Sequence, residues 1–169
     1  MKHFLYYLIL GSNLDDRIGQ VTLAKRYITE KAGAIVHESS LYETQPWGHE
    51  EQPWFINQVI EVNSPLEPAE LLYTLKIIET VVGRKPHEKW HERHIDIDII
   101  LNEDTVIDEE TLIIPHPLFH LRNFVLIPLM EIAPFLIHPV LGKSIEELYL
   151  DCLDTGEVYI FSADEQGDS

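Results

Sequence analysis

Two aspartates, Asp96 and Asp98, stand two residues apart inside an isoleucine-rich segment, 94–100. Residues two apart in a β-strand face the same side, about 6.6 Å from each other. Two carboxylates at this spacing repel each other unless a cation lies between them. Oxygen ligands with open water positions suit Mg²⁺. A solvated pair on a wet sheet face is the alternative interpretation, so the motif alone indicates no more than a candidate metal site.

A basic loop runs directly into this segment. It carries a local charge of +2, from four basic residues against two glutamates, in a chain whose formal net charge is −17: Arg84, Lys85, Lys89 and Arg93. Guanidinium groups bind phosphate oxygens through paired donors. Arg84 and Arg93 can therefore bracket a phosphate beside the aspartates, and Trp90 can close over it when the loop folds down. A solvated turn is the alternative for the loop alone, but loop and acidic pair together favour phosphoryl or pyrophosphoryl transfer.

A third group of residues suits a flat ligand. Aromatic faces can sandwich a ring, and an amide offers both a donor and an acceptor to its edge: Trp47, Trp54, Phe55, Asn57 and Phe124. Phe55 and Asn57 are two residues apart and so share a strand face. For each aromatic residue alone, ordinary core packing is the alternative. The polar Asn57 among them is less easily explained by packing.

His116 and Arg122 form a further candidate pair. Pro115 and Pro117 hold His116 rigidly through their fixed φ angles, and Arg122 is a third candidate for a phosphate. A structural or surface role is the alternative for His116. No zinc-ligand spacing connects the histidines that we interpret as structural or exposed: His3, His37, His49, His120 and His138. The sequence contains neither a P-loop nor a dinucleotide-binding glycine motif.

The elements that must position these groups follow from hydrophobic periodicity and from chain breakers. Strands are predicted over 6–10, 34–42, 54–62 and 94–101, with helices from the Asp15-Asp16 cap to about Lys31 and from Pro68 to about Val82. The order β-α-β-β-α-β predicts an α+β, ferredoxin-like fold, in which two helices cover one face of an antiparallel sheet. On the last strand, Ile95, Ile97 and Ile99 are expected to face the core.

One domain is expected over residues 1–169, with a core of about 5–102, a C-terminal extension of about 103–163 and a frayed tail, 164–169. The extension contains a short strand over 112–114, helices over 123–133 and 144–150, and a segment, 158–161, that can pair with a sheet edge.

Composition narrows the class of protein. Of the 169 residues, 45% are hydrophobic and 24% are charged, which is ordinary for a soluble globular chain. No apolar run reaches the roughly 18 residues of a membrane span, and the N-terminal stretch is interpreted as a strand, not a signal peptide. The acidic balance argues against a nucleic-acid partner. Cys152 is the only cysteine, which fits a reducing cytoplasm. We expect a cytoplasmic monomer that binds no nucleic acid and no membrane.

Seven motifs then occur in order: Leu10-Gly11-Ser12-Asn13-Leu14, Tyr42-Glu43-Thr44-Gln45-Pro46-Trp47-Gly48, Gln52-Pro53-Trp54-Phe55-Ile56-Asn57, Gly83-Arg84, Arg93-His94-Ile95-Asp96-Ile97-Asp98, Pro115-His116-Pro117, and Phe124-Val125-Leu126-Ile127-Pro128-Leu129 with Glu131-Ile132-Ala133-Pro134. Together they resemble the 6-hydroxymethyl-7,8-dihydropterin pyrophosphokinases, over roughly residues 6–150. The resemblance implies transfer of pyrophosphate from ATP to the hydroxymethyl oxygen of the pterin, with release of AMP, in folate biosynthesis. Attack on the β-phosphorus would be in line.

The resemblance also implies roles for individual residues. Two Mg²⁺ ions would sit on Asp96 and Asp98, and Arg84 and Arg93 would aid catalysis. ATP, the co-substrate, would contact a set on three segments: Arg84, Trp90, Arg93, Ile99, His116 and Arg122. The pterin would be held by aromatic, amide and backbone groups: Thr44, Pro46, Trp47, Phe55, Asn57 and Phe124.

The sequence departs from the family pattern in two places. Lys89-Trp90-His91-Glu92-Arg93 stands where the family usually has Arg-Trp-Gly-Pro-Arg, so a Gly-Pro turn is replaced and Glu92 adds a negative charge. Phe55 stands where a tyrosine is common. Two other functions stay open from the residues alone. One is an ATP-dependent transferase acting on another flat alcohol, and the other is a ferredoxin-like regulatory module that binds a small ligand without Mg²⁺.

Overall fold

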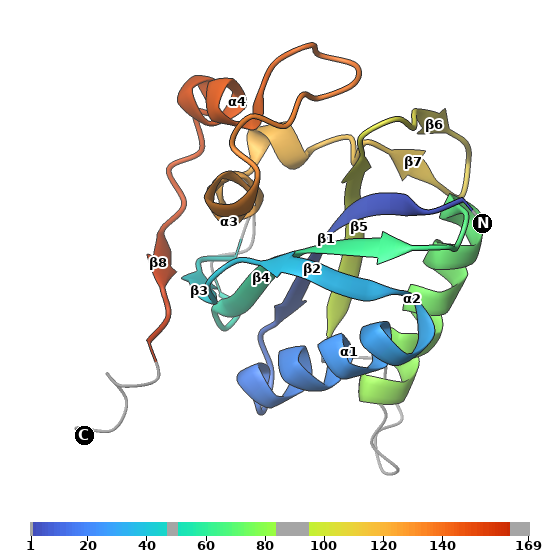
Figure 1. The fold of residues 1–169 in the computed structure, drawn as a ribbon. Coiled ribbons are helices and arrows are strands. Elements are labelled where there is room, and N and C mark those ends of the chain that lie inside the picture. Colours follow the sequence, from blue (N-terminus) through green and yellow to red (C-terminus); the bar gives the residue numbers. More distant parts are fainter. Residues whose placement is uncertain (1, 47–50, 84–94, 163–169) are drawn as a thin grey trace.

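The structure is a computed structural model that describes residues 2–46, 51–83 and 95–162. Its elements alternate along the chain (Figure 1): β1 (Phe4–Ser12), α1 (Arg17–Lys31), β2 (Ala34–Glu38), β3 (Tyr42–Thr44), β4 (Phe55–Ser64), α2 (Pro68–Gly83), β5 (Asp96–Asn102), β6 (Ile107–Asp108), β7 (Ile113–Ile114), the 3-10 helix η1 (Phe119–Leu121), α3 (Asn123–Ile132), α4 (Ile145–Asp151) and β8 (Val158–Ile160). Among the described residues, no helix is long and apolar enough to cross a membrane.

The main sheet is antiparallel throughout and runs in the order β5-β1-β4-β3-β8, with β2 also paired to β4. The four strands β5, β1, β4 and β2 with helices α1 and α2 give the ferredoxin-like arrangement, so the predicted fold is confirmed. The single strand expected over 34–42 is instead two strands. Ser39 separates them, because its hydroxyl accepts a hydrogen bond from the Val59 N–H and its carbonyl accepts one from the Gln58 amide.

Two hydrophobic cores lie on opposite faces of this sheet. One packs alternate residues of the central strands against α1 and α2, and it includes Leu8, Ile28, Leu75 and Ile97. The other packs Tyr7, Ile9 and Val59 against α3 and α4, with partners from the extension such as Leu126 and Leu129. Figure 1 shows α1 and α2 on one side of the sheet and α3 on the other. The extension therefore covers part of the face that the ferredoxin-like core leaves open.

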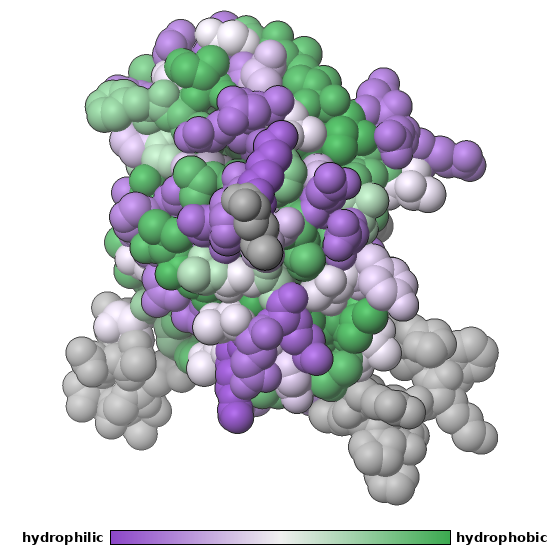
Figure 2. Space-filling view, turned by 45° about the vertical axis from the view of Figure 1, so that its right-hand side comes forward, coloured by the Kyte–Doolittle hydropathy of each residue, from purple (hydrophilic) through white to green (hydrophobic). Residues whose placement is uncertain are grey.

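The extension also completes one edge of the sheet. Strand β8 pairs antiparallel with β3, as expected for a segment near 158–161, and β6 and β7 form a small separate ribbon. Helix α4 begins at a capping box, in which the Ser144 side chain accepts from the Glu147 N–H and the Glu147 carboxylate accepts from the Ser144 N–H. On the face drawn in Figure 2, hydrophilic side chains are spread among hydrophobic ones, in keeping with the acidic composition.

The first core generates a stability prediction. Leu75 is fully buried between α2 and the sheet, so Leu75→Ala is expected to lower the free energy of unfolding by about 2–5 kcal/mol. Urea unfolding followed by circular dichroism measures the change. Tyr73→Ala on the same helix is the control, because that side chain is 70% exposed and its loss should cost no more than about 0.5 kcal/mol. Equal losses for the two variants would contradict the placement of this core.

Candidate active site

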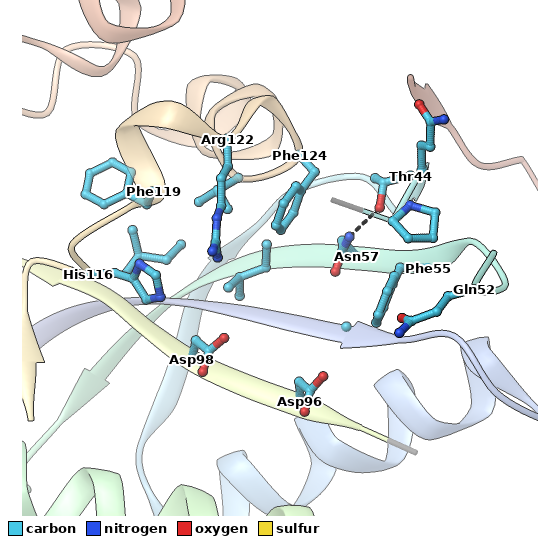
Figure 3. A pocket seen from close by; sticks show the side chains of 16 residues that line it. Thr44, Gln52, Phe55, Asn57, Asp96, Asp98, His116, Phe119, Arg122 and Phe124 are labelled. Atoms are coloured by element: carbon cyan, nitrogen blue, oxygen red, sulfur yellow. Dashed lines mark hydrogen bonds between the residues drawn. The ribbon is translucent and has the colours of Figure 1, made fainter. Parts of the chain in front are cut away.

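The register of three strands fixes the floor of the site. Gly11 on β1 pairs with Asn57 on β4 and with Asp96 on β5, so these three residues form one row across the sheet. In the next row, Ile9 pairs with Asp98. Because residues two apart on a strand share a face, Asp96 and Asp98 point to the same side as Asn57. Figure 3 shows both carboxylates and the amide directed into one hollow.

The extension and the loop after β3 supply the walls of this hollow. Phe119, Arg122 and Phe124 come from η1 and the start of α3, while Thr44 and its neighbours stand across from them (Figure 3). The empty volume is about 890 Å³, including the open mouth, which is within the usual size of a small-molecule site. Sixteen residues line it: Ile9, Gly11, Thr44, Gln45, Pro46, Gln52, Phe55, Asn57, Asp96, Asp98, Ile100, His116, Phe119, Arg122, Phe124 and Val125.

The acidic pair alternates with buried isoleucines, as predicted. Ile95 and Ile97 are almost fully buried in the core, whereas Asp96 is half-buried and Asp98 is exposed. In the part of the chain that the structure describes, no group of three or more His, Cys, Asp or Glu side chains could enclose a metal ion. Two carboxylates beside an open hollow fit a cation that takes few protein ligands and completes its shell with water and ligand oxygens, as Mg²⁺ does.

The Asn57 amide is held in a fixed orientation. Its Nδ2 donates to the Thr44 hydroxyl over 2.6 Å, and the residue is only 4% exposed. Its Oδ1 lies against Gly11, where a Cβ atom would collide with it. An amide has a second N–H and a carbonyl to offer, so a ring edge can meet both a donor and an acceptor here. Gly11 is therefore glycine because the amide needs the space, which agrees with the meaning of glycine inside a strand.

Two aromatic rings border this amide. Phe55 rises from β4 and Phe124 descends from α3, and Figure 3 shows Asn57 between them. Trp54, which the sequence grouped with these rings, does not line the hollow. Its ring stacks on Tyr159 of β8, with centroids 6.1 Å apart and planes within 6° of parallel. The interpretation of Trp54 as a ligand-facing ring was therefore wrong, because β8 covers that side chain.

His116 and Arg122 lie on the side of the hollow nearest Asp98. The His116 N–H donates to the Ile100 carbonyl over 2.7 Å, and its Nδ1 accepts from the Leu118 N–H over 3.2 Å. Burial lowers the pKa of His116, with Asp98 acting in the opposite direction. A neutral ring whose Nδ1 is an acceptor carries its proton on Nε2. His116 can therefore offer one N–H donor to a ligand.

Arg122 is the residue at the N-cap position of α3, yet its side chain makes no capping hydrogen bond. The guanidinium points toward the hollow instead, 5.9 Å from the Phe124 ring centroid. Burial lowers the pKa of Arg122, while Asp98 and Asp154 raise it. A guanidinium remains charged under these conditions, so the group offers a cation beside the acidic pair.

A second recess adjoins the first. It is lined from α2, β5 and the segment before His116, and it shares Asp98 and His116 with the main hollow: Leu72, Ile97, Asp98, Ile99, Glu110, Thr111, Leu112, Ile113, His116 and Pro117. Ile99 reaches this recess from the core side of β5. Ile99 therefore lies away from the aromatic and amide group, although it belongs to the same strand as Asp96 and Asp98.

Sequence reasoning missed several lining residues, among them Gln45, Gln52 and Phe119. Gly11 was noted only as part of a motif, although a glycine that interrupts an apolar strand is a detectable signal of close approach. The predictions for Trp47, Arg84, Trp90 and Arg93 lie outside the described residues, as do Lys85 and Lys89. Thr44, Pro46, Phe55, Asn57, Phe124 and the acidic pair come together in one hollow.

Comparison with known proteins identifies the group to which the chain is related. The model of the 7,8-dihydro-6-hydroxymethylpterin-pyrophosphokinase (HPPK) family matches residues 7–134. The chain belongs to this family. A relative from Aquifex aeolicus, named 2-amino-4-hydroxy-6-hydroxymethyldihydropteridine pyrophosphokinase, is 43% identical over 83% of this chain and 88% of its own. A relative of the same name from Haemophilus influenzae is 39% identical over 79% of this chain and 84% of its own.

Longer proteins also contain an HPPK-like segment. The folic acid synthesis protein fol1 of Pneumocystis carinii is 39% identical over 88% of this chain, which spans only 20% of that protein. The crystal structure of wild-type Plasmodium falciparum HPPK-DHPS has a TM-score of 0.73 at 19% identity, over 89% of this chain and 43% of that one. The chain thus spans less than half of these longer relatives, and the structural likeness supports the fold alone.

The environment of His116 leads to a prediction about its protonation. Because burial lowers its pKa, the NMR titration of His116 in ligand-free, chelator-treated protein should have a midpoint below about 6.5, with the neutral ring protonated on Nε2. The unfolded chain then binds the proton first as the pH falls through about 6.5, so this residue's contribution to stability is lost on acidification. His116→Asn should remove that part of the pH dependence. A midpoint above 6.5 would contradict the burial.

Proposed function

We propose that the chain transfers pyrophosphate from ATP to the hydroxymethyl oxygen of 6-hydroxymethyl-7,8-dihydropterin, giving AMP and the pterin diphosphate in folate biosynthesis. One observation carries the proposal. A single hollow joins an acidic pair suited to Mg²⁺ with an amide between two aromatic rings. Because the chain belongs to the hydroxymethylpterin pyrophosphokinases, the flat ligand at this amide is proposed to be a pterin. We further propose a cytoplasmic monomer whose partners are these small molecules, with no nucleic acid and no membrane involved.

The aromatic end of the hollow would bind the pterin. Phe55 and Phe124 would stack on its two faces, and the Asn57 amide would hydrogen-bond its edge. Thr44 and Pro46 line the same end and would contact the ring, together with Trp47 as the sequence predicts. Because Thr44 fixes one N–H of Asn57, the other donor and the carbonyl would meet the ligand in a set geometry. The hydroxymethyl group would then point toward β5.

The acidic end would receive ATP. Asp96 and Asp98 would hold two Mg²⁺ ions, which when bound neutralise charge on the polyphosphate. Arg122 would donate to phosphate oxygens, and His116 would add its Nε2–H. The recess that contains Ile99 is lined mainly by apolar side chains and includes Asp98, so it is proposed to receive the base of the nucleotide. Arg84, Trp90 and Arg93 are proposed to complete the phosphate site from the loop between α2 and β5.

The reaction would depend on positioning more than on acid-base chemistry. The rings and the amide hold the hydroxymethyl oxygen for in-line attack on the β-phosphorus, and the cationic side chains stabilise charge that develops on the phosphate oxygens. His116 is a poor candidate for a general base, because its Nδ1 already accepts from Leu118 and its Nε2 carries the proton. No described side chain is placed as a strong base for the hydroxymethyl group.

The proposed function is tested by mixing the protein with MgATP and hydroxymethyl-dihydropterin and measuring AMP by chromatography. AMP should form only when Mg²⁺ is present, and a chelator should abolish it. Asp98→Asn removes one charged ligand and should lower kcat on the order of 100-fold. Glu38→Gln, an exposed carboxylate on β2, is the matched control and should stay near wild type. Turnover of Asp98→Asn close to wild type would refute the metal assignment.

Gly11 gives an independent test of the pterin end. Gly11→Ala places a Cβ against Asn57 Oδ1, so the amide must shift, and the KM for the pterin should rise about tenfold or more. Steady-state kinetics at saturating MgATP measures it. In an Asn57→Ala background the same change should cost much less, because the group that it displaces is gone. Equal effects of Gly11→Ala in both backgrounds would show that the collision is not the cause.

A further inference from the structure

A segment near the C-terminus, residues 154–160, runs past three walls of the hollow without lining it. This C-terminal strap lies outside residues 7–134, the part that matches the family. We infer that the strap sets the shape of the hollow, with Asp154 as the positioning residue that holds Phe124 at the pterin end and Arg122 beside the acidic pair. The inference rests on the proposed function for the identity of the ligand.

The first attachment is to the start of α3. The Asp154 carboxylate accepts from the Asn123 N–H over 3.0 Å, and the Asn123 amide donates to the Gly156 carbonyl over 2.6 Å and to the Asp154 carbonyl over 3.3 Å. Asn123 stands between the two site residues Arg122 and Phe124. These hydrogen bonds hold both the backbone and the side chain of Asn123. They therefore also hold the backbone from which Arg122 and Phe124 extend into the hollow.

This attachment explains how Arg122 can serve the site. A helix needs an acceptor for the N–H groups of its first turn, and the residue at the N-cap normally supplies it. Arg122 occupies that position but has no acceptor. Asp154, 31 residues beyond Asn123, supplies an acceptor to the Asn123 N–H. Its negative charge also suits the positive end of the α3 dipole. The arginine is thereby left to point into the hollow.

The second attachment is to the loop after β3. Gln45 and Glu157 exchange two hydrogen bonds, from the Gln45 N–H to the Glu157 carbonyl at 3.0 Å and from the Glu157 N–H to Gln45 Oε1 at 3.2 Å. The pairing of β8 with β3 continues this ladder, with Thr44 opposite Val158. Thr44 is the hydroxyl that orients the Asn57 amide. The strap is thus connected to the amide through one intervening residue.

The third attachment is to the start of β4. Tyr159 stacks on Trp54, the residue that immediately precedes Phe55. The strap therefore contacts the chain next to Phe124 on one wall, next to Phe55 on another and at Gln45 between them. These are the groups that would sandwich the pterin, so a displaced strap would alter the spacing of the rings while leaving the acidic pair on β5 untouched.

The test compares variants of Asp154 in the whole chain. Asp154→Ala removes the cap, so the start of α3 should open more often and the KM for the pterin should rise about tenfold, and kcat should fall as well because the same turn holds Arg122. Asp154→Asn keeps an oxygen for the Asn123 N–H but loses the acceptor of the Gly156 N–H, so it should raise the KM less than Asp154→Ala does. Asp151→Ala is the control, since that exposed carboxylate pairs with Lys143 on the surface and its loss should change neither constant.

Hydrogen exchange provides a readout that does not depend on turnover. The amides of Val125 and Leu126 bond to the Arg122 carbonyl in the first turn of α3, and they should exchange about tenfold faster in Asp154→Ala. If Asp154→Ala does not fold, Asn123→Ala removes the side-chain half of the same attachment and should shift both readouts in the same direction. Failure of wild-type protein to release AMP would refute the proposed function alone. Unchanged hydrogen exchange of Val125 and Leu126, or an unchanged pterin KM in folded variants of an active enzyme, would refute the role inferred for the strap.

Discussion

The antiparallel register of β1 between β4 and β5 is the constraint on which the site depends. It places Asn57, Gly11 and Asp96 in one row. Only strand β1 therefore separates the Asn57 amide, which would bind the edge of a ring, from the Asp96 carboxylate, which would bind a metal. Gly11 at the centre leaves the space in which the Asn57 side chain lies. A larger residue there would force the amide aside, so the row works only with a glycine in the middle.

The remaining face of the sheet is built around this row by the C-terminal extension. The ferredoxin-like core alone covers one face with α1 and α2, and it would leave the acidic pair on an open surface. Helix α3 brings its own hydrophobic core to the second face and begins above the strands with Arg122 and Phe124. The hollow therefore exists because α3 and its hydrophobic core cover only part of the sheet face that carries the acidic pair, and the strap connects these two parts.

Much of this could be predicted from the sequence because the period of a strand is strict. The alternation of Asp96 and Asp98 with isoleucines fixed which groups face outward, and chain breakers delimited the βαββαβ core. The break at Ser39 was missed, because a hydroxyl that bonds across to Val59 has no periodic signature. Trp54 was misassigned for a similar reason, since its partner Tyr159 lies 105 residues away. Long-range pairs such as Asn123 with Asp154 also leave no local pattern.

The alternation on β5 has a consequence for how the protein can vary. Ile95, Ile97 and Ile99 belong to the helix-covered core, whereas Asp96 and Asp98 line the hollow. Neighbouring positions of β5 are therefore under different constraints. Substitutions of the isoleucines are limited by packing in the core, and substitutions of the aspartates are limited by the chemistry of the hollow. A slip of the strand by one residue would exchange the two sets at once and bury both carboxylates. Folding to the correct register and acquiring the chemistry are therefore the same event on this strand.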